Sequence, residues 1–151
     1  MENSEKLIDQ FLLPFDDRLT SLVQELRQFF KSKTKPKYEL VGNSTISLNI
    51  GYGFTEKAWD CYCAIIVYSK HINLSFPSGA FISDPNNLLV GNGKRIRHIK
   101  IADYDDMTNP DILNLILEAK SAALAKFDDK NCEFKDVKTL VKPIKGIKKR
   151  L

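Results

Sequence analysis

Two stretches of the chain place apolar residues at the i, i+3, i+4, i+7 spacing of an amphipathic helix. The first predicts a helix over residues 16–31, because two acids stand at its start and a proline follows its end. The second predicts a helix over 109–127, capped by Thr108 or Asn109, with Pro110 at its first position. The two main helices therefore lie near opposite ends of the chain.

Strand patterns fill the region between these helices. Residues 45–50 alternate strictly between apolar and polar side chains, and so do residues 71–76. Residues 59–68 are apolar on both faces, which is typical of a central strand. A charged strand is predicted over 95–101, and the glycines and prolines of 77–93 predict an ordered connection before it.

This order of elements predicts an α+β fold. We expect a two-layer sandwich, in which an antiparallel sheet of about five strands carries the N- and C-terminal helices on one face. Several strands have one polar side, so the other sheet face is expected to be exposed. The predicted domain covers residues 1–130, and residues 131–151 form a basic C-terminal tail.

Charge is distributed unevenly along the 151 residues. The net charge is +4, but residues 137–151 contain six cations and no acid, so the rest of the chain carries −2. The basic balance therefore does not make the domain itself a nucleic-acid binder. Neither a cleavable leader nor an apolar run of about 18 residues is present, so we expect a soluble protein without a membrane span.

Three cysteines, Cys61, Cys63 and Cys132, cannot all pair within one chain. Cys61 and Cys63 are too close in an extended segment for an unstrained disulfide, and they are expected to share a face with Trp59 and Ile65. We interpret them as buried, reduced thiols rather than metal ligands, which favours a cytoplasmic protein.

The segment 91–101, GNGKRIRHIKI, concentrates positive charge after two glycines. If Ile99 and Ile101 enter the core, His98 lies on the exposed sheet face, and the same parity places His71 and Asn73 there. The segment and its neighbouring strand therefore predict a ligand- or partner-binding site. Its residues are His71, Asn73, Lys94, Arg97 and His98. Such cations suit a carboxylate or phosphate group.

Other interpretations of this segment remain open. Its cations can instead pair with acids such as Asp84 or Glu39 and hold the preceding connection. A phosphate-binding loop is disfavoured, because a strand rather than a helix follows Gly93.

Acids before the second long helix form a candidate metal site. Asp103, Asp105 and Asp106 offer oxygen ligands for a hard cation, although their spacing does not match an EF-hand and acids are common at helix starts. No catalytic motif is found, so the sequence predicts no catalytic residues and no firmly assigned cofactor.

The block 68–101 resembles the YdhG-like family of bacterial domains. The resemblance rests on a Lys-x-His and Asn-Leu hairpin, a Gly-Ala pair, an Asp-Pro, a Leu-Leu and a Gly-x-Gly-Lys-x-x-Arg-His strand. These motifs are Lys70, His71, Asn73, Leu74, Gly79, Ala80, Asp84, Pro85, Leu88, Leu89, Gly91, Gly93, Lys94, Arg97 and His98. The family often has Trp-Gly-x-Pro where residues 38–44 read YELVGNS. The resemblance implies a frataxin-like fold, and some members are described as iron-handling.

The functional prediction is a non-enzymatic binding module for a small ligand or a protein partner. Iron binding or chaperoning is its most specific form, as the resemblance implies. The alternative is anion or nucleic-acid binding through residues 94–100 and the basic tail. An enzyme that uses His71 or His98 as an acid–base group is a third possibility.

Overall fold

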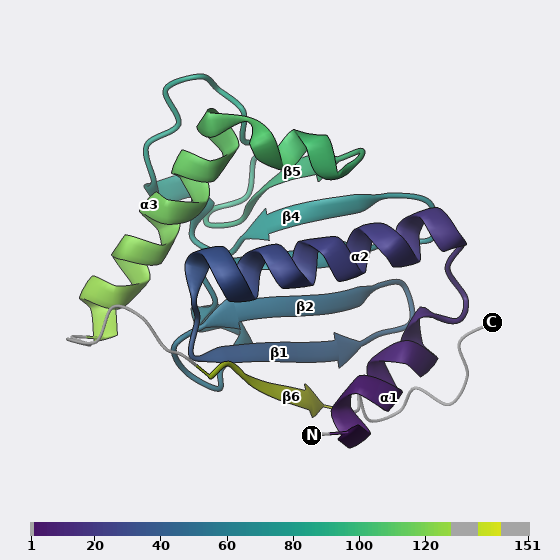
Figure 1. The fold of residues 1–151 in the computed structure, drawn as a ribbon. Coiled ribbons are helices and arrows are strands. Elements are labelled where there is room, and N and C mark those ends of the chain that lie inside the picture. Colours follow the sequence, from purple (N-terminus) through teal and green to yellow (C-terminus); the bar gives the residue numbers. More distant parts are fainter. Residues whose placement is uncertain (1, 128–135, 143–151) are drawn as a thin grey trace.

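The computed structural model describes residues 2–127 and 136–142. In this part of the chain the sheet has six strands, one more than the predicted number. They are β1 (Tyr38–Asn43), β2 (Leu48–Gly53), β3 (Cys63–Val67), β4 (Ile72–Phe76), β5 (Arg97–Ile101) and β6 (Lys138–Lys142). Their order is β5-β4-β3-β2-β1-β6, and all neighbours are antiparallel except β1 and β6 (Figure 1). The predicted α+β class is confirmed.

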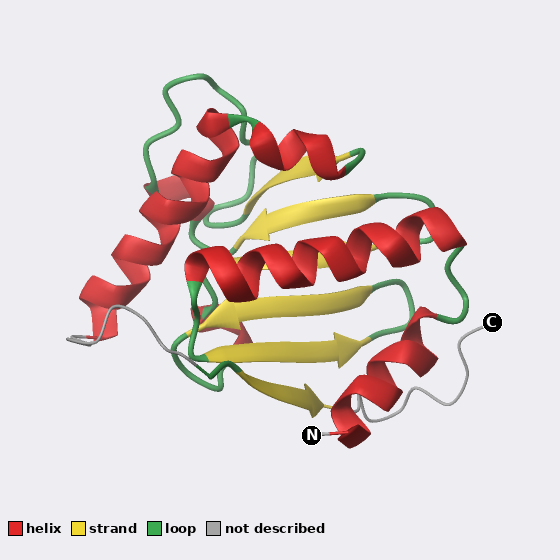
Figure 2. Cartoon of the chain, in the orientation of Figure 1, coloured by secondary structure: helices red, strands yellow, loops and turns green. Residues whose placement is uncertain are grey.

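The two long helices that the apolar pattern predicts are α2 (Asp17–Phe29), which continues as a π-helical turn (Phe30–Thr34), and α3 (Pro110–Phe127). A shorter helix, α1 (Glu2–Leu12), precedes them. The Asp16 carboxylate accepts the Leu19 amide at 2.8 Å, and the side-chain Oδ1 of Asn109 accepts the Asp111 amide at 2.9 Å. Figure 2 shows α2 across the middle of the sheet, α1 near the β6 edge and α3 beside the strand ends.

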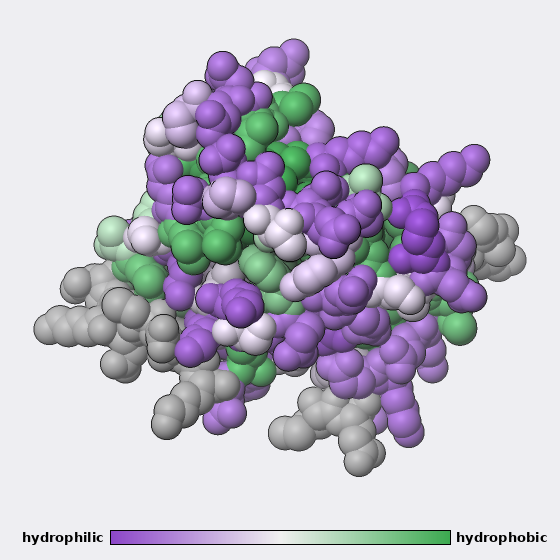
Figure 3. Space-filling view, turned by 45° about the horizontal axis from the view of Figure 1, so that its top comes forward, coloured by the Kyte–Doolittle hydropathy of each residue, from purple (hydrophilic) through white to green (hydrophobic). Residues whose placement is uncertain are grey.

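One face of the sheet and the helices share a hydrophobic core. A row of paired residues crosses this face, from Val41 through Ile50, Ile65 and Leu74 to Ile99, and all five are buried. The helices pack on this face, which agrees with the predicted layering. On the helical side of the molecule the surface is mainly hydrophilic, with smaller hydrophobic patches (Figure 3).

An ionic network centred on the buried Arg27 joins helices α1 and α2 to the sheet. Arg27 donates to both Glu39 carboxylate oxygens, at 3.0 and 2.9 Å, and also to Glu5. Tyr52 and Thr139 donate their hydroxyls to Glu39 at 2.6 and 2.8 Å. Burial acts to raise the pKa of Glu39, but the hydrogen bonds and charge of Arg27 outweigh it and lower this pKa.

The sheet extends past residue 130, where the sequence predicted the domain to end. Residues 138–142, assigned to a basic tail, form β6 in parallel with β1. Val141 packs against the core, while Lys138 and Lys142 are exposed, so the alternation of side chains explains how a cationic segment becomes an edge strand. Residues 143–151 and Cys132 lie outside the described residues.

All four predicted strands begin later than the apolar pattern indicates, and β2 and β3 differ most. Ser44 and Ser47 close a turn, with the Ser44 amide donating to the Ser47 carbonyl at 2.9 Å, so β2 starts at Leu48. Ile46 was predicted to share a face with Leu48 and Ile50, but it is 75% exposed, whereas those two residues are buried. The segment before β3 forms a 3-10 turn, η2 (Ala58–Asp60), instead of continuing the strand.

Candidate ligand-binding trough

The sheet face opposite the core has small side chains at its centre. Strand pairing aligns Leu40, Gly51, Ala64, Ser75 and His98 in one row across five strands. A second row places Gly42, Asn49, Ile66, Asn73 and Lys100 side by side. Glycine and alanine in the middle leave this face hollow, whereas its margins carry longer polar side chains.

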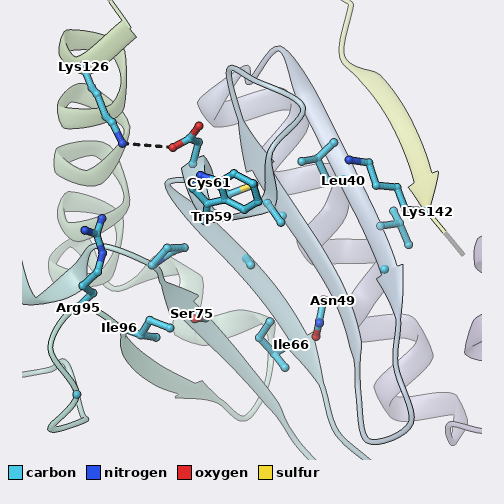
Figure 4. A pocket seen from close by; sticks show the side chains of 18 of the residues that line it. Leu40, Asn49, Trp59, Cys61, Ile66, Ser75, Arg95, Ile96, Lys126 and Lys142 are labelled. Carbon is cyan, nitrogen blue, oxygen red and sulfur yellow. Dashed lines mark hydrogen bonds and ion pairs between the residues drawn. The ribbon is translucent and has the colours of Figure 1, made fainter. Parts of the chain in front are cut away.

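An open trough of about 930 Å³ lies over these rows. We call it the open-face trough, and its floor is formed by Leu40, Gly42, Gly51, Ala64, Ile66 and Ser75. Its walls are the η2 segment with Trp59 and Cys61, and the loop before β5 with Ile96 (Figure 4). Trp59 is 70% and Ile96 58% exposed, so two large apolar side chains face solvent beside an apolar floor.

Gly51 explains how η2 comes so near the sheet. A Cβ atom at this position would lie 2.7 Å from the Cys61 sulfur, closer than such atoms approach. A strand glycine is therefore used here for close approach. Cys61 covers β2 from the open side, whereas Cys63 lies in the core below, so the prediction that they share a face is wrong.

Both described cysteines are buried, as the sequence predicts. Burial raises the pKa of the Cys61 thiol to about 12, and it raises the pKa of Cys63 further. The thiolate is the nucleophilic form, so neither side chain is activated for covalent chemistry at neutral pH.

Four cations line the open-face trough, namely Lys94, Arg95, Lys126 and Lys142. Asp60 also lines it and binds Lys126, with the Lys126 nitrogen 3.2 Å from the carboxylate. In Figure 4, Arg95 and Lys126 lie on the same side of the trough and Lys142 lies across from them. The charges of the lining thus sum to a positive value, which attracts anions.

The five predicted binding residues do not form one cluster. Only Lys94 lines the open-face trough. Asn73 and His98 lie on the same sheet face towards the β5 margin. His71 precedes β4 and stacks on Tyr68, with ring centroids 4.8 Å apart. Arg97 donates to the carbonyl groups of Gly93 and Ile96 at 2.7 and 2.8 Å, so it holds its own loop.

The interpretation that these cations pair with acids is not supported by the contacts found. Arg95 donates to the Ser78 hydroxyl at 3.2 Å and lies 5.6 Å from the centre of the Phe81 ring. Asp84 accepts the amides of Leu88 and Leu89 instead. Backbone carbonyls and a hydroxyl, rather than carboxylates, hold the loop.

Two of the three acids of the candidate metal site, Asp103 and Asp106, act as local caps through their side chains. Asp103 accepts the Asp105 amide at 2.9 Å, and Asp106 accepts the Ala102 amide at 2.8 Å. Among residues 2–127 and 136–142, no group of three His, Cys, Asp or Glu side chains is arranged to hold a metal ion. The acids of this segment therefore have the role that is common at helix starts, where a carboxylate accepts backbone amides.

Most lining residues of the trough were missed by sequence reasoning. Trp59 and Cys61 were interpreted as strand residues, and Leu40, Lys126 and Lys142 were not singled out. These side chains come from distant segments that meet only in the folded sheet. For the wall formed by η2, the available indication was Gly51 and Gly53 next to a strand pattern, because glycine within a strand often marks close backbone approach.

Comparison of the chain with protein-family models, curated proteins and solved structures found no match in any of the three. The resemblance to the YdhG-like family therefore stays a prediction carried by residues 68–101. Among the described residues, no helix has the length and apolar character needed to cross a membrane.

Proposed function

We propose that this protein is a non-enzymatic binding module that holds a small organic anion with an apolar body in the open-face trough. The trough itself is the observation that carries this proposal. Its volume of about 930 Å³ falls within the range typical of small-molecule sites. Such sites combine an apolar lining with a few polar groups that fix orientation.

The apolar part of the ligand is favoured by the floor and walls. Leu40, Ala64 and Ile66 supply aliphatic surface, and Trp59 supplies an exposed ring at the wall. Burying such surface under a ligand removes it from water, at about 25 cal/mol for each Å². A rigid strand floor also loses little conformational entropy on binding, which favours affinity.

The anionic part is favoured by the charges at the same place. Four cations, Lys94, Arg95, Lys126 and Lys142, line the trough together with a single acid, Asp60. Lys94 is exposed and has no hydrogen-bond or ion-pair partner among the described residues. Its charge is therefore available to a carboxylate or phosphate group.

The absence of activated groups at the trough supports binding rather than catalysis. The raised pKa of Cys61 disfavours its thiolate, and His71 and His98 are not part of the lining. We do not propose iron binding at Asp103, Asp105 and Asp106, because the side chains of Asp103 and Asp106 already accept capping hydrogen bonds.

A matched pair of amphiphiles tests the proposal. Trp59 is the single tryptophan, so its fluorescence reports on the trough directly. Decanoate and decyltrimethylammonium carry the same chain with opposite charge and are titrated below their micelle concentrations. We expect saturable, one-site binding of decanoate and much weaker binding of the cation. Equal binding of both, or binding of neither, would contradict the proposal.

Charge reversal at one lysine provides the variant test. Lys94→Glu is expected to weaken decanoate binding about three- to tenfold, because an attractive contact becomes repulsive. Lys100→Glu is the control, since Lys100 is also an exposed lysine of this region but does not line the trough. If an oligothymidylate displaces decanoate with a steep salt dependence, the nucleic-acid alternative replaces this proposal.

A further inference from the structure

A second hollow of about 400 Å³ lies between α3 and the sheet end. We call it the α3 pocket, and its apolar lining includes Phe76, Phe81, Ile82, Ala119, Ala122 and Phe127. Phe76 comes from β4, Phe81 and Ile82 from the connection after it, and the alanines from one side of α3. Small residues on the helix keep this space open where larger ones would fill it.

The α3 pocket and the open-face trough meet at a polar junction. Five residues line both hollows, namely Trp59, Asp60, Cys61, Arg95 and Lys126. Three of them are charged, and the Lys126–Asp60 ion pair at 3.2 Å connects α3 to η2 there (Figure 4). Two apolar compartments therefore adjoin a junction whose own charges, two cations and one acid, sum to +1.

We infer that the ligand is an anion with an apolar arm on each side of its charged group, such as a phosphodiester between two alkyl chains. This inference rests on the proposed function and specifies its ligand class. The phosphate lies at the junction, where Arg95 and Lys126 donate to its oxygens. One arm covers the floor of the open-face trough, and the other enters the α3 pocket.

Asp60 is compatible with an anion at this junction. Its carboxylate is nearly buried and is already engaged by Lys126 and by the Thr55 hydroxyl at 3.3 Å. Lys126 is 59% exposed, so it retains donors that face solvent and can bind a second acceptor. Asp60 thus positions Lys126 and neutralises its charge, while Arg95 supplies the net positive charge of the junction.

Two monoanionic phosphodiesters separate the roles of the arms. Dihexyl phosphate has two long arms, whereas hexyl methyl phosphate has one, with the same charge. Each buried methylene strengthens binding by about fourfold, so we expect dihexyl phosphate to bind at least tenfold more tightly. Affinities are measured by calorimetry, together with decanoate as the reference ligand.

Filling the α3 pocket then tests where the second arm lies. Ala122→Phe is expected to bring the affinity for dihexyl phosphate to within about threefold of that for hexyl methyl phosphate, and to leave the latter unchanged. Ala125→Phe is the matched control, because Ala125 is exposed on α3 and lines neither hollow. Ala122→Leu serves if the larger substitution impairs folding, which circular dichroism reports.

The outcomes distinguish this inference from the proposed function. Decanoate binding without any preference for dihexyl phosphate would overturn the two-armed ligand and leave the trough as a binding site. Loss of affinity for both phosphodiesters in Ala122→Phe would also overturn it. If no amphiphilic anion binds at all, the proposed function itself fails.

Discussion

Glu39 is a fully buried carboxylate whose hydrogen bonds reach three other elements of the fold. Arg27 of α2, Tyr52 of β2 and Thr139 of β6 all donate to it. A buried charge is costly unless it is paired, and removing one partner of such a pair destabilises a protein strongly. This carboxylate therefore links the helical layer to both neighbours of β1.

The pKa of Glu39 predicts how stability depends on pH. This pKa is lower in the folded than in the unfolded state, so the unfolded chain takes up protons first as pH falls. Stability is thus present above an ordinary carboxyl pKa of about 4.3 and is lost as pH falls towards the lowered value. We expect Glu39→Gln to cost about 3 kcal/mol at pH 7 and to flatten this decline. Urea unfolding between pH 7 and pH 3 measures both effects.

Gly51 and Cys61 pack tightly against each other at the trough wall. We expect Gly51→Ala to destabilise the fold by about 1–3 kcal/mol, because the new methyl group overlaps the Cys61 sulfur. Cys61→Ala in the same chain relieves the overlap and should restore part of the loss. Gly42→Ala is the control, since nothing lies within 4 Å of its added Cβ atom. Equal effects of the two alanine substitutions, measured by denaturant unfolding, would contradict this account.

β5 is the element for which the face assignment from sequence succeeded. Ile99 and Ile101 are 8% and 1% exposed and join the core, while His98 pairs with Ser75 on the open side. The glycine turn before it is present as well, with Gly91 at a φ of 136° and Val90 bridged to His98. Alternation over five residues was enough to place Ile99, Ile101 and His98, but not Arg97, which binds the carbonyl groups of its own loop.

A pair of substitutions in β5 tests this assignment. Ile99→Ala removes buried methyl groups and is expected to cost about 2–5 kcal/mol. His98→Ala is expected to change stability by less than about 0.5 kcal/mol, because its side chain is partly exposed on the open face. Melting curves of the two variants give the comparison. A similar loss of stability in both would mean that the faces of β5 are inverted.

The helices were easier to predict than the strands, for a local reason. Asp16, Asn109 and Pro110 determine helix starts through contacts within four residues, so the sequence contains the information. The start of β2 depends on the Ser44–Ser47 turn. Strand β1 was missed because a glutamate such as Glu39 is typical of a surface position, and only the folded structure shows that Arg27 pairs with it in the interior. Contacts between distant segments therefore decided what the local pattern left ambiguous.

The candidate site could not be predicted from the sequence, because it too depends on contacts between distant segments. The open-face trough combines β1, β2, β3, β4 and η2 with the loop before β5, and with single lysines from α3 and β6. No short segment contains more than a small part of it. The charged run at 91–101 did indicate its cationic side, since Lys94 and Arg95 line the trough, but Trp59 and Lys126 became relevant only through the sheet order.

Binding at the trough is coupled to the stability of the entire domain, because its floor consists of the strands that also form the core. A ligand that binds only the folded state stabilises it by about 2.7 kcal/mol at a concentration 100 times its Kd. For a chain of 151 residues, we therefore expect a rise in Tm of about 5–10 °C. Decanoate is the ligand for this measurement by differential scanning calorimetry. Lys94→Glu should reduce the rise at the same ligand concentration, whereas Lys100→Glu should preserve it. A rise that is the same in all three proteins would place the ligand away from the cations of the open-face trough.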